Sequence, residues 1–154
     1  MRDNIWLQNR LIYVWDRYFS DIEKKNDVIV KFGSRARTRL GSIRYHNKNK
    51  FNLNPSTEIR LTGFFVDENI PEYIIDLTIA HELCHYAHGF FSPHPALSRF
   101  PHKGGVVDNE LKERGFTQML LIQKKWLKEV WPKIIGPRKR KARRRNNLFY
   151  LFRI

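Results

Sequence analysis

His81, Glu82 and His85 form an HExxH sequence inside a mostly apolar, proline-free stretch of the chain. An α-helix turns once every ~3.6 residues, so the two imidazoles would stack about 6 Å apart on one face and bind one divalent cation together. Glu82 is rotated by ~100° from His81, so it would reach a nearby water without being a ligand. This pattern is typical of hydrolytic zinc sites. We therefore expect Zn²⁺ at His81 and His85 and a general base at Glu82.

An open zinc site needs a third protein ligand, and two residues compete for this position. His102 lies seventeen residues after His85, at the far end of a loop whose chain can fold back over the helix. Glu110 lies twenty-five residues after His85, in the first turn of a further expected helix. The sequence favours His102 as the third ligand and keeps Glu110 as the alternative.

Other side chains near the motif fit a role in metal binding or catalysis less well. His88 would lie about 10 Å along the helix axis from His81, at ~1.5 Å per residue, and His94 stands close to the end of the helix. Cys84 lies inside the motif on another face, where a small buried hydrophobe is expected rather than a nucleophile. Stabilisation of a developing oxyanion could come from Tyr86, Lys103 or Arg114.

The rest of the chain predicts one α+β domain over residues 1–136, because 154 residues suffice for a single core. We expect a compact minimal zincin in which an N-terminal helix and a sheet of about three strands pack on the active-site helix. A long loop and a C-terminal helix follow. The predicted helices are 3–25, 72 to about 89 and 108–131, the last ended by Pro132, and the predicted strands are 28–32, 38–45 and 58–65.

Several segments together resemble the SprT-like zinc metallopeptidase superfamily over roughly residues 28–131. They are Thr38–Ser42, the strand with Ile59–Leu61, the HExxH sequence, and a histidine followed within two residues by glycine. The resemblance implies a zincin fold and hydrolysis of proteins, including proteins bound or crosslinked to DNA. The ligands and general base that it implies are His81, His85, His102 and Glu82.

The chain departs from this family in two ways. Many members carry a cysteine-rich zinc ribbon after the peptidase domain, whereas Cys84 is the single cysteine here. Val106 and Val107 stand where the family usually has an aromatic residue, which leaves Glu110 open as the third ligand.

Positive charge is concentrated near the end of the chain. Lys and Arg number 29 against 15 Asp and Glu, and residues 137–154 contain no acidic residue. We expect this tail to be a flexible arm that binds nucleic acid through Arg138, Lys139, Arg140, Lys141, Arg143, Arg144 and Arg145. A second basic cluster, between Lys24 and Lys50, indicates either a nucleic-acid footprint or a solvated surface; it includes Arg35, Arg37, Arg39 and Arg44.

These observations predict a cytoplasmic, monomeric, zinc-dependent endopeptidase, with DNA-associated proteins as candidate substrates. The alternative is a non-catalytic nucleic-acid-binding module with a structural zinc site. No run of apolar residues is long enough to span a membrane. The apolar segment 148–152 after the arginine run leaves a further alternative, binding to a membrane surface through the tail.

Overall fold

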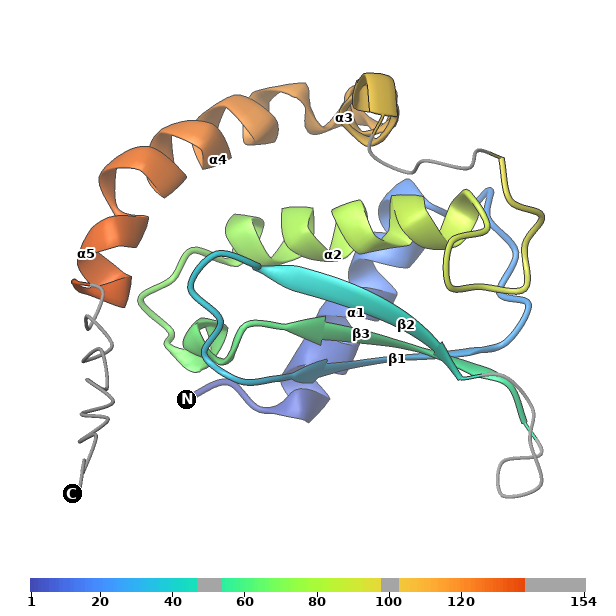
Figure 1. The fold of residues 1–154 in the computed structure, drawn as a ribbon, viewed down its shortest axis with the longest axis horizontal. Helices are drawn as coiled ribbons and strands as arrows, with labels where there is room; N and C mark the ends of the chain where they lie inside the picture. Colours follow the sequence, from blue (N-terminus) through green and yellow to red (C-terminus); the bar gives the residue numbers. More distant parts are fainter. Residues whose placement is uncertain (47–53, 98–102, 138–154) are drawn as a thin grey trace, which may run out of the picture.

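The computed structural model describes residues 1–46, 54–97 and 103–137, and it confirms the predicted α+β fold (Figure 1). An N-terminal helix precedes a three-stranded sheet, and the remaining helices follow the sheet. In chain order the elements are α1 (Asn4–Tyr18), β1 (Asp27–Phe32), β2 (Gly41–His46), β3 (Ser56–Leu61), the 3-10 turn η1 (Gly63–Val66), α2 (Glu72–Ala87), η2 (Lys103–Gly105), α3 (Val106–Leu111), the π-helical turn η3 (Lys112–Phe116), α4 (Thr117–Glu129) and α5 (Trp131–Ile135).

The sheet has the order β1-β3-β2, with β1 parallel and β2 antiparallel to the central strand. Ile59 of β3 pairs in register with Val30 of β1 and Ile43 of β2, and all three side chains are buried in the core. Because side chains alternate across a strand, these residues mark the face on which the helices pack. Both α1 and α2 contact the sheet and each other, so they cover this one face.

Helix α1 begins at the N-cap Asp3, whose carboxylate accepts a hydrogen bond from the backbone N–H of Trp6 at 2.7 Å. It ends at Tyr18, seven residues earlier than the periodicity predicts. Ile22, the last residue of the apolar stripe, lies beyond the end of the helix. The Trp15 Nε1 holds it there by donating a hydrogen bond to the Ile22 carbonyl at 3.1 Å. Ile22 therefore packs against the core from an irregular segment.

Helix α2 carries the HExxH sequence, and twelve of its sixteen residues are buried. In Figure 1 it lies between the sheet and the arch formed by α4 and α5, with α1 behind it. The helix ends at Ala87, close to the predicted end. Gly89 follows with φ +75, and a Cβ there would lie 2.3 Å from the Pro95 carbonyl oxygen. A glycine is therefore required where the chain leaves the helix.

The last predicted helix is instead divided. Gly115 adopts φ +93 inside η3 and bends the chain between α3 and α4. Helix α4 ends at Glu129, and Pro132 lies in the first turn of α5 rather than acting as a terminator. Trp131 anchors α5 to the body of the molecule: its ring contacts Phe64, and its Nε1 donates a hydrogen bond to the Arg37 carbonyl at 2.9 Å.

Candidate metal centre

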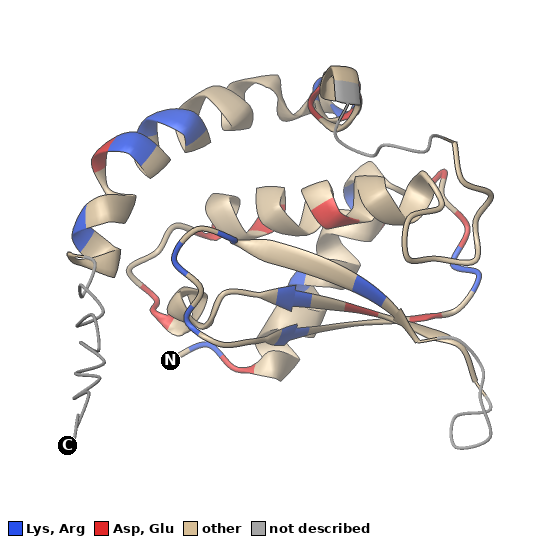
Figure 2. Cartoon of the chain, in the orientation of Figure 1, with Lys and Arg blue, Asp and Glu red and all other residues tan. Residues whose placement is uncertain are grey.

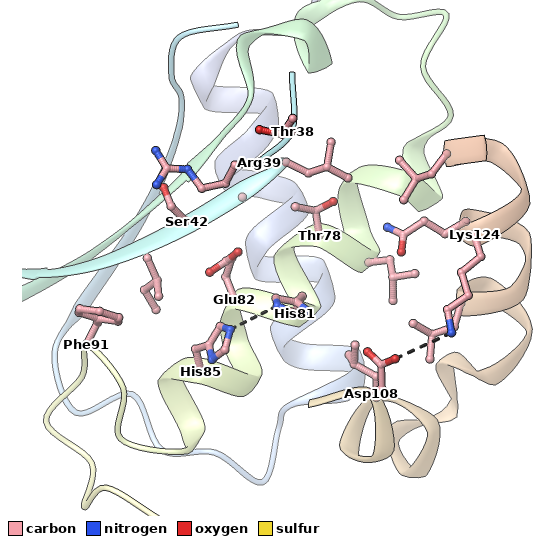
Figure 3. Close-up of a pocket in the computed structure, with 18 residues that line it drawn as sticks. Thr38, Arg39, Ser42, Thr78, His81, Glu82, His85, Phe91, Asp108 and Lys124 are labelled. Carbon is pink, nitrogen blue, oxygen red and sulfur yellow. Dashed lines mark hydrogen bonds and ion pairs between the residues drawn. The ribbon is translucent and has the colours of Figure 1, made fainter. Parts of the chain in front are cut away.

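The two imidazoles of the HExxH sequence face each other on α2, as the helical spacing predicts. The Nε2 atoms of His81 and His85 are 3.2 Å apart, and the ring planes are inclined at 77° (Figure 3). Zinc–nitrogen bonds of ~2.0–2.1 Å at a tetrahedral angle would place two ligand nitrogens about 3.3–3.4 Å apart. The separation of the two nitrogens therefore fits a shared divalent cation of this size.

Glu82 is buried beside this pair, with 6% of its surface exposed. Burial raises the pKa of its carboxyl to about 7, and the positive charge of Arg39 acts in the opposite direction. A Cβ placed on Gly41 would lie only 2.6 Å from Glu82 Oε1 and 2.9 Å from Thr78 Cγ2. The glycine at the start of β2 therefore lets the strand approach the carboxylate closely.

A cleft of about 640 Å³ opens over these three residues (Figure 3). One wall is residues 38–43, which lead into β2, and the other wall comes from α3 and α4. Apolar side chains from the helices line it together with polar groups from both walls. Besides the HExxH residues, the polar side chains of the lining are Thr38, Arg39, Ser42, Thr78, Asp108, Gln123 and Lys124.

The Glu110 carboxylate is bonded to two side chains outside the HExxH sequence. It accepts a hydrogen bond from Arg114 Nε at 2.8 Å and forms another with His88 Nε2. Asp108, two residues earlier and turned by about 200° on the helix, is the α3 carboxylate that lines the cleft, where Lys124 Nζ lies 3.9 Å from its Oδ2. Sequence reasoning did not single out Asp108.

His102, the favoured third ligand, lies outside the described residues, and so do the basic residues 138–145 and the apolar segment 148–152. In the described ranges, no group of three or more His, Cys, Asp or Glu side chains is arranged to hold a metal ion. The third ligand therefore stays a prediction, with His102 and Glu110 as its candidates.

Two of the residues expected to stabilise an oxyanion are engaged elsewhere. The Tyr86 hydroxyl donates a hydrogen bond to Asn26 Oδ1 at 2.8 Å, and Arg114 donates to both Asp21 and Glu110. Donors that do line the cleft, such as those of Arg39 and Ser42, come from a segment about forty residues before the motif. A glycine inside a predicted strand, as at position 41, is the one sequence signal that marks this close approach.

Cys84 is buried, as its position in the motif predicts, and burial raises the pKa of its thiol. A protonated thiol in the core is a small hydrophobe rather than a nucleophile.

Comparisons of the chain with protein-family models, curated proteins and solved structures gave no match. Within the described residues, no helix has both the length and the apolar character needed to cross a membrane.

Proposed function

We propose that the protein is a zinc-dependent endopeptidase and a member of the SprT-like superfamily. The observation that carries this proposal is the convergence of His81 Nε2 and His85 Nε2, 3.2 Å apart, beside the buried Glu82 at the floor of an open cleft. These imidazoles would hold the cation, with His102 as the third ligand and Glu110 as the alternative. A bound divalent cation would supply Lewis acidity, which polarises a carbonyl and lowers the pKa of a water.

Glu82 would act as the general base and then as the general acid. Its carboxylate lines the cleft beside the imidazoles, from where it can accept a proton from a water and later deliver it to the leaving nitrogen. Close packing of Gly41 and Thr78 limits the positions open to this carboxylate. The β2 wall therefore holds the proton-transfer group in one place, which is what efficient catalysis requires.

The cleft has a volume typical of sites that enclose a small ligand or part of a chain. Its apolar wall includes Leu77, Leu111 and Leu120, and its opposite rim carries Arg39 and Ser42. This combination suits a peptide, whose side chains are apolar or charged and whose backbone needs hydrogen-bond partners. Proteins associated with DNA are the substrates that we expect to be cleaved.

The rival function is a nucleic-acid-binding module in which zinc only holds the fold together. A structural zinc site is closed by four protein ligands, whereas a hydrolytic site keeps a position for water and substrate. The imidazole pair opens on a 640 Å³ cleft with a carboxylate beside it, and this arrangement favours the enzyme.

The test compares the zinc-loaded wild type with the variant Glu82→Gln on an unfolded protein substrate such as casein, with and without duplex DNA. We expect the variant to keep one zinc per chain and to lose hydrolysis by at least about 100-fold, because the base is removed and the ligands are not. The control is Glu129→Gln, an exposed carboxylate at the end of α4, which should cleave like the wild type. Hydrolysis that survives Glu82→Gln would remove the mechanism.

A further inference from the structure

The sheet has a second face, opposite the one on which α1 and α2 pack. Figure 1 views the sheet from this side, with α1 behind it. The residues that alternate with the buried core positions point here: Asp27, Ile29 and Lys31 on β1, Ser42, Arg44 and His46 on β2, and Ser56, Glu58 and Arg60 on β3. We call these nine residues the outer face of the sheet.

The outer face is basic toward the C-terminal ends of β1 and β3, and its exposed carboxylate, Asp27, lies at the opposite end. Lysine or arginine occurs on each of its three strands (Figure 2). The carboxylate that lies among the basic residues, Glu58, is almost fully buried and bonds to Lys31 Nζ at 2.5 Å and to Arg60 Nε. Burial alone would raise the pKa of Glu58, but the hydrogen bonds from Lys31 and Arg60 outweigh it and lower the pKa. The carboxylate is therefore ionised at neutral pH and offsets only one of the positive charges.

Arg44 adds a charge that Glu58 does not neutralise. It stands directly opposite Glu58 in the β2–β3 register, is exposed, and forms no ion pair within the residues that the structure describes. Arg39, just before β2, is exposed as well and extends the basic surface to the rim of the cleft. Four cationic side chains, Lys31, Arg39, Arg44 and Arg60, thus lie on the outer face or at its border with the cleft.

The three arginines of this group line a small cavity. It has a volume of about 150 Å³, and Arg39, Arg44 and Arg60 line it together with the hydroxyl-bearing Ser34 and Ser42. No acidic residue is part of the lining that the structure describes. Guanidinium groups and hydroxyls are the donors that proteins use to bind phosphate oxygens.

We infer that the outer face binds the phosphate backbone of a nucleic acid, with one phosphate in the cavity lined by the three arginines. The described residues of the face include no Phe, Tyr or Trp on which bases could stack, so we expect its contacts to be mainly with phosphate and sugar. Binding would therefore be independent of base sequence and strongly dependent on salt.

The outer face lies next to the cleft, so a nucleic acid bound there would lie close to the candidate metal centre. Arg39, Gly41 and Ser42 line both the 150 Å³ cavity and the 640 Å³ cleft, from opposite sides of the chain that enters β2. A nucleic acid on the outer face would bring proteins bound to it next to Glu82. This last step rests on the proposed function, whereas binding itself does not.

The test measures the affinity of the full chain for a fluorescent 20-bp duplex of mixed sequence between 50 and 200 mM salt. The variant Arg39→Ala/Arg44→Ala removes two phosphate contacts but no ion pair of Glu58. We expect at least about tenfold weaker binding and a slope of log K against log salt that is less negative by about 2. The control Lys125→Ala/Lys128→Ala removes the same charge from exposed positions on α4 and should change the slope by less than half as much.

Three results would overturn the inference. The first is a slope of log K against log salt that changes equally in the double variant and in its control. Both variants keep the same basic tail, so an equal change would mean that the outer face makes no contribution of its own. The second is equal dependence on Arg39 and Arg44 for phosphatidylserine vesicles or polyglutamate, which would indicate a general polyanion surface. The third is unchanged DNA binding in the single variant Arg44→Glu. This variant keeps the test valid if the double variant fails to fold. Because Glu82→Gln should bind DNA like the wild type, failure of hydrolysis and failure of binding are separate outcomes.

Discussion

The burial of Glu82 predicts a conflict between catalysis and stability that can be measured in the metal-free protein. The carboxyl is 6% exposed, and burial raises its pKa from an ordinary value of 4.5 to about 7. Between these two pH values the folded chain holds a proton that the unfolded chain has released, so stability falls as the pH rises. Above pH 7 both states are ionised, and the whole cost of burying the charge is present.

The size of this cost follows from the shift in pKa. At ~1.4 kcal/mol per unit, a shift from 4.5 to about 7 corresponds to about 3 kcal/mol above neutral pH. Glu82→Gln removes the charge and keeps the shape of the side chain. In the presence of a chelator, the variant should therefore be more stable than the wild type by about 3 kcal/mol at pH 8 and by less than about 0.5 kcal/mol at pH 4.5.

The assay is urea unfolding of both proteins with chelator at pH 4.5, 6 and 8, checked for equal m-values. The control Glu129→Gln removes an exposed carboxylate and should show no such pH-dependent gain. If Glu82→Gln were no more stable than the wild type at pH 8, the carboxylate would not carry the burial cost on which this reasoning depends.

Three other substitutions test the packing around the site. Gly41→Ala should reduce hydrolysis by displacing Glu82, whereas Gly33→Ala, whose Cβ would meet nothing closer than 3.5 Å, should not; equal activity in both would contradict the packing argument. Arg114→Ala should lower the free energy of unfolding by about 2–5 kcal/mol, because it leaves the half-buried Glu110 without its cation, and a loss under about 1 kcal/mol in urea would oppose this. Trp131→Ala should cost about 3–5 kcal/mol by removing the buried ring that anchors α5, a result that an unchanged melting temperature would refute.

The features that the sequence predicts well are those set by local periodicity. Helix α2, its end near Gly89 and the pairing of His81 with His85 follow from a repeat of ~3.6 residues and a glycine that leaves the helix. The three strands are also predicted from short runs between turn residues, but the third ends at Leu61 rather than at 65, because Gly63–Val66 form a 3-10 turn.

Features that depend on tertiary contacts could not be predicted in this way. The stripe of apolar residues runs on to Ile22 because Trp15 holds that residue in an irregular segment, so the pattern overstates the length of α1. Periodicity also does not show the bend at Gly115, which needs a positive φ.

Within the site, the direction of a carboxylate depends on its neighbours. Glu110 is turned toward His88 and Arg114, while Asp108 lines the cleft. Their spacing places them on opposite faces of α3 but does not show which face meets the cleft. The contribution of Arg39 and Ser42 likewise arises only when β2 packs beside α2.

Zinc uptake tests the central claim most directly. In equilibrium dialysis against Zn²⁺ buffered by a competing chelator, the wild type should take up one ion per chain. The variant His81→Ala/His85→Ala should take up none, because both converging imidazole nitrogens are gone. Equal stoichiometry and affinity in the two proteins would show that these imidazoles do not form the metal site.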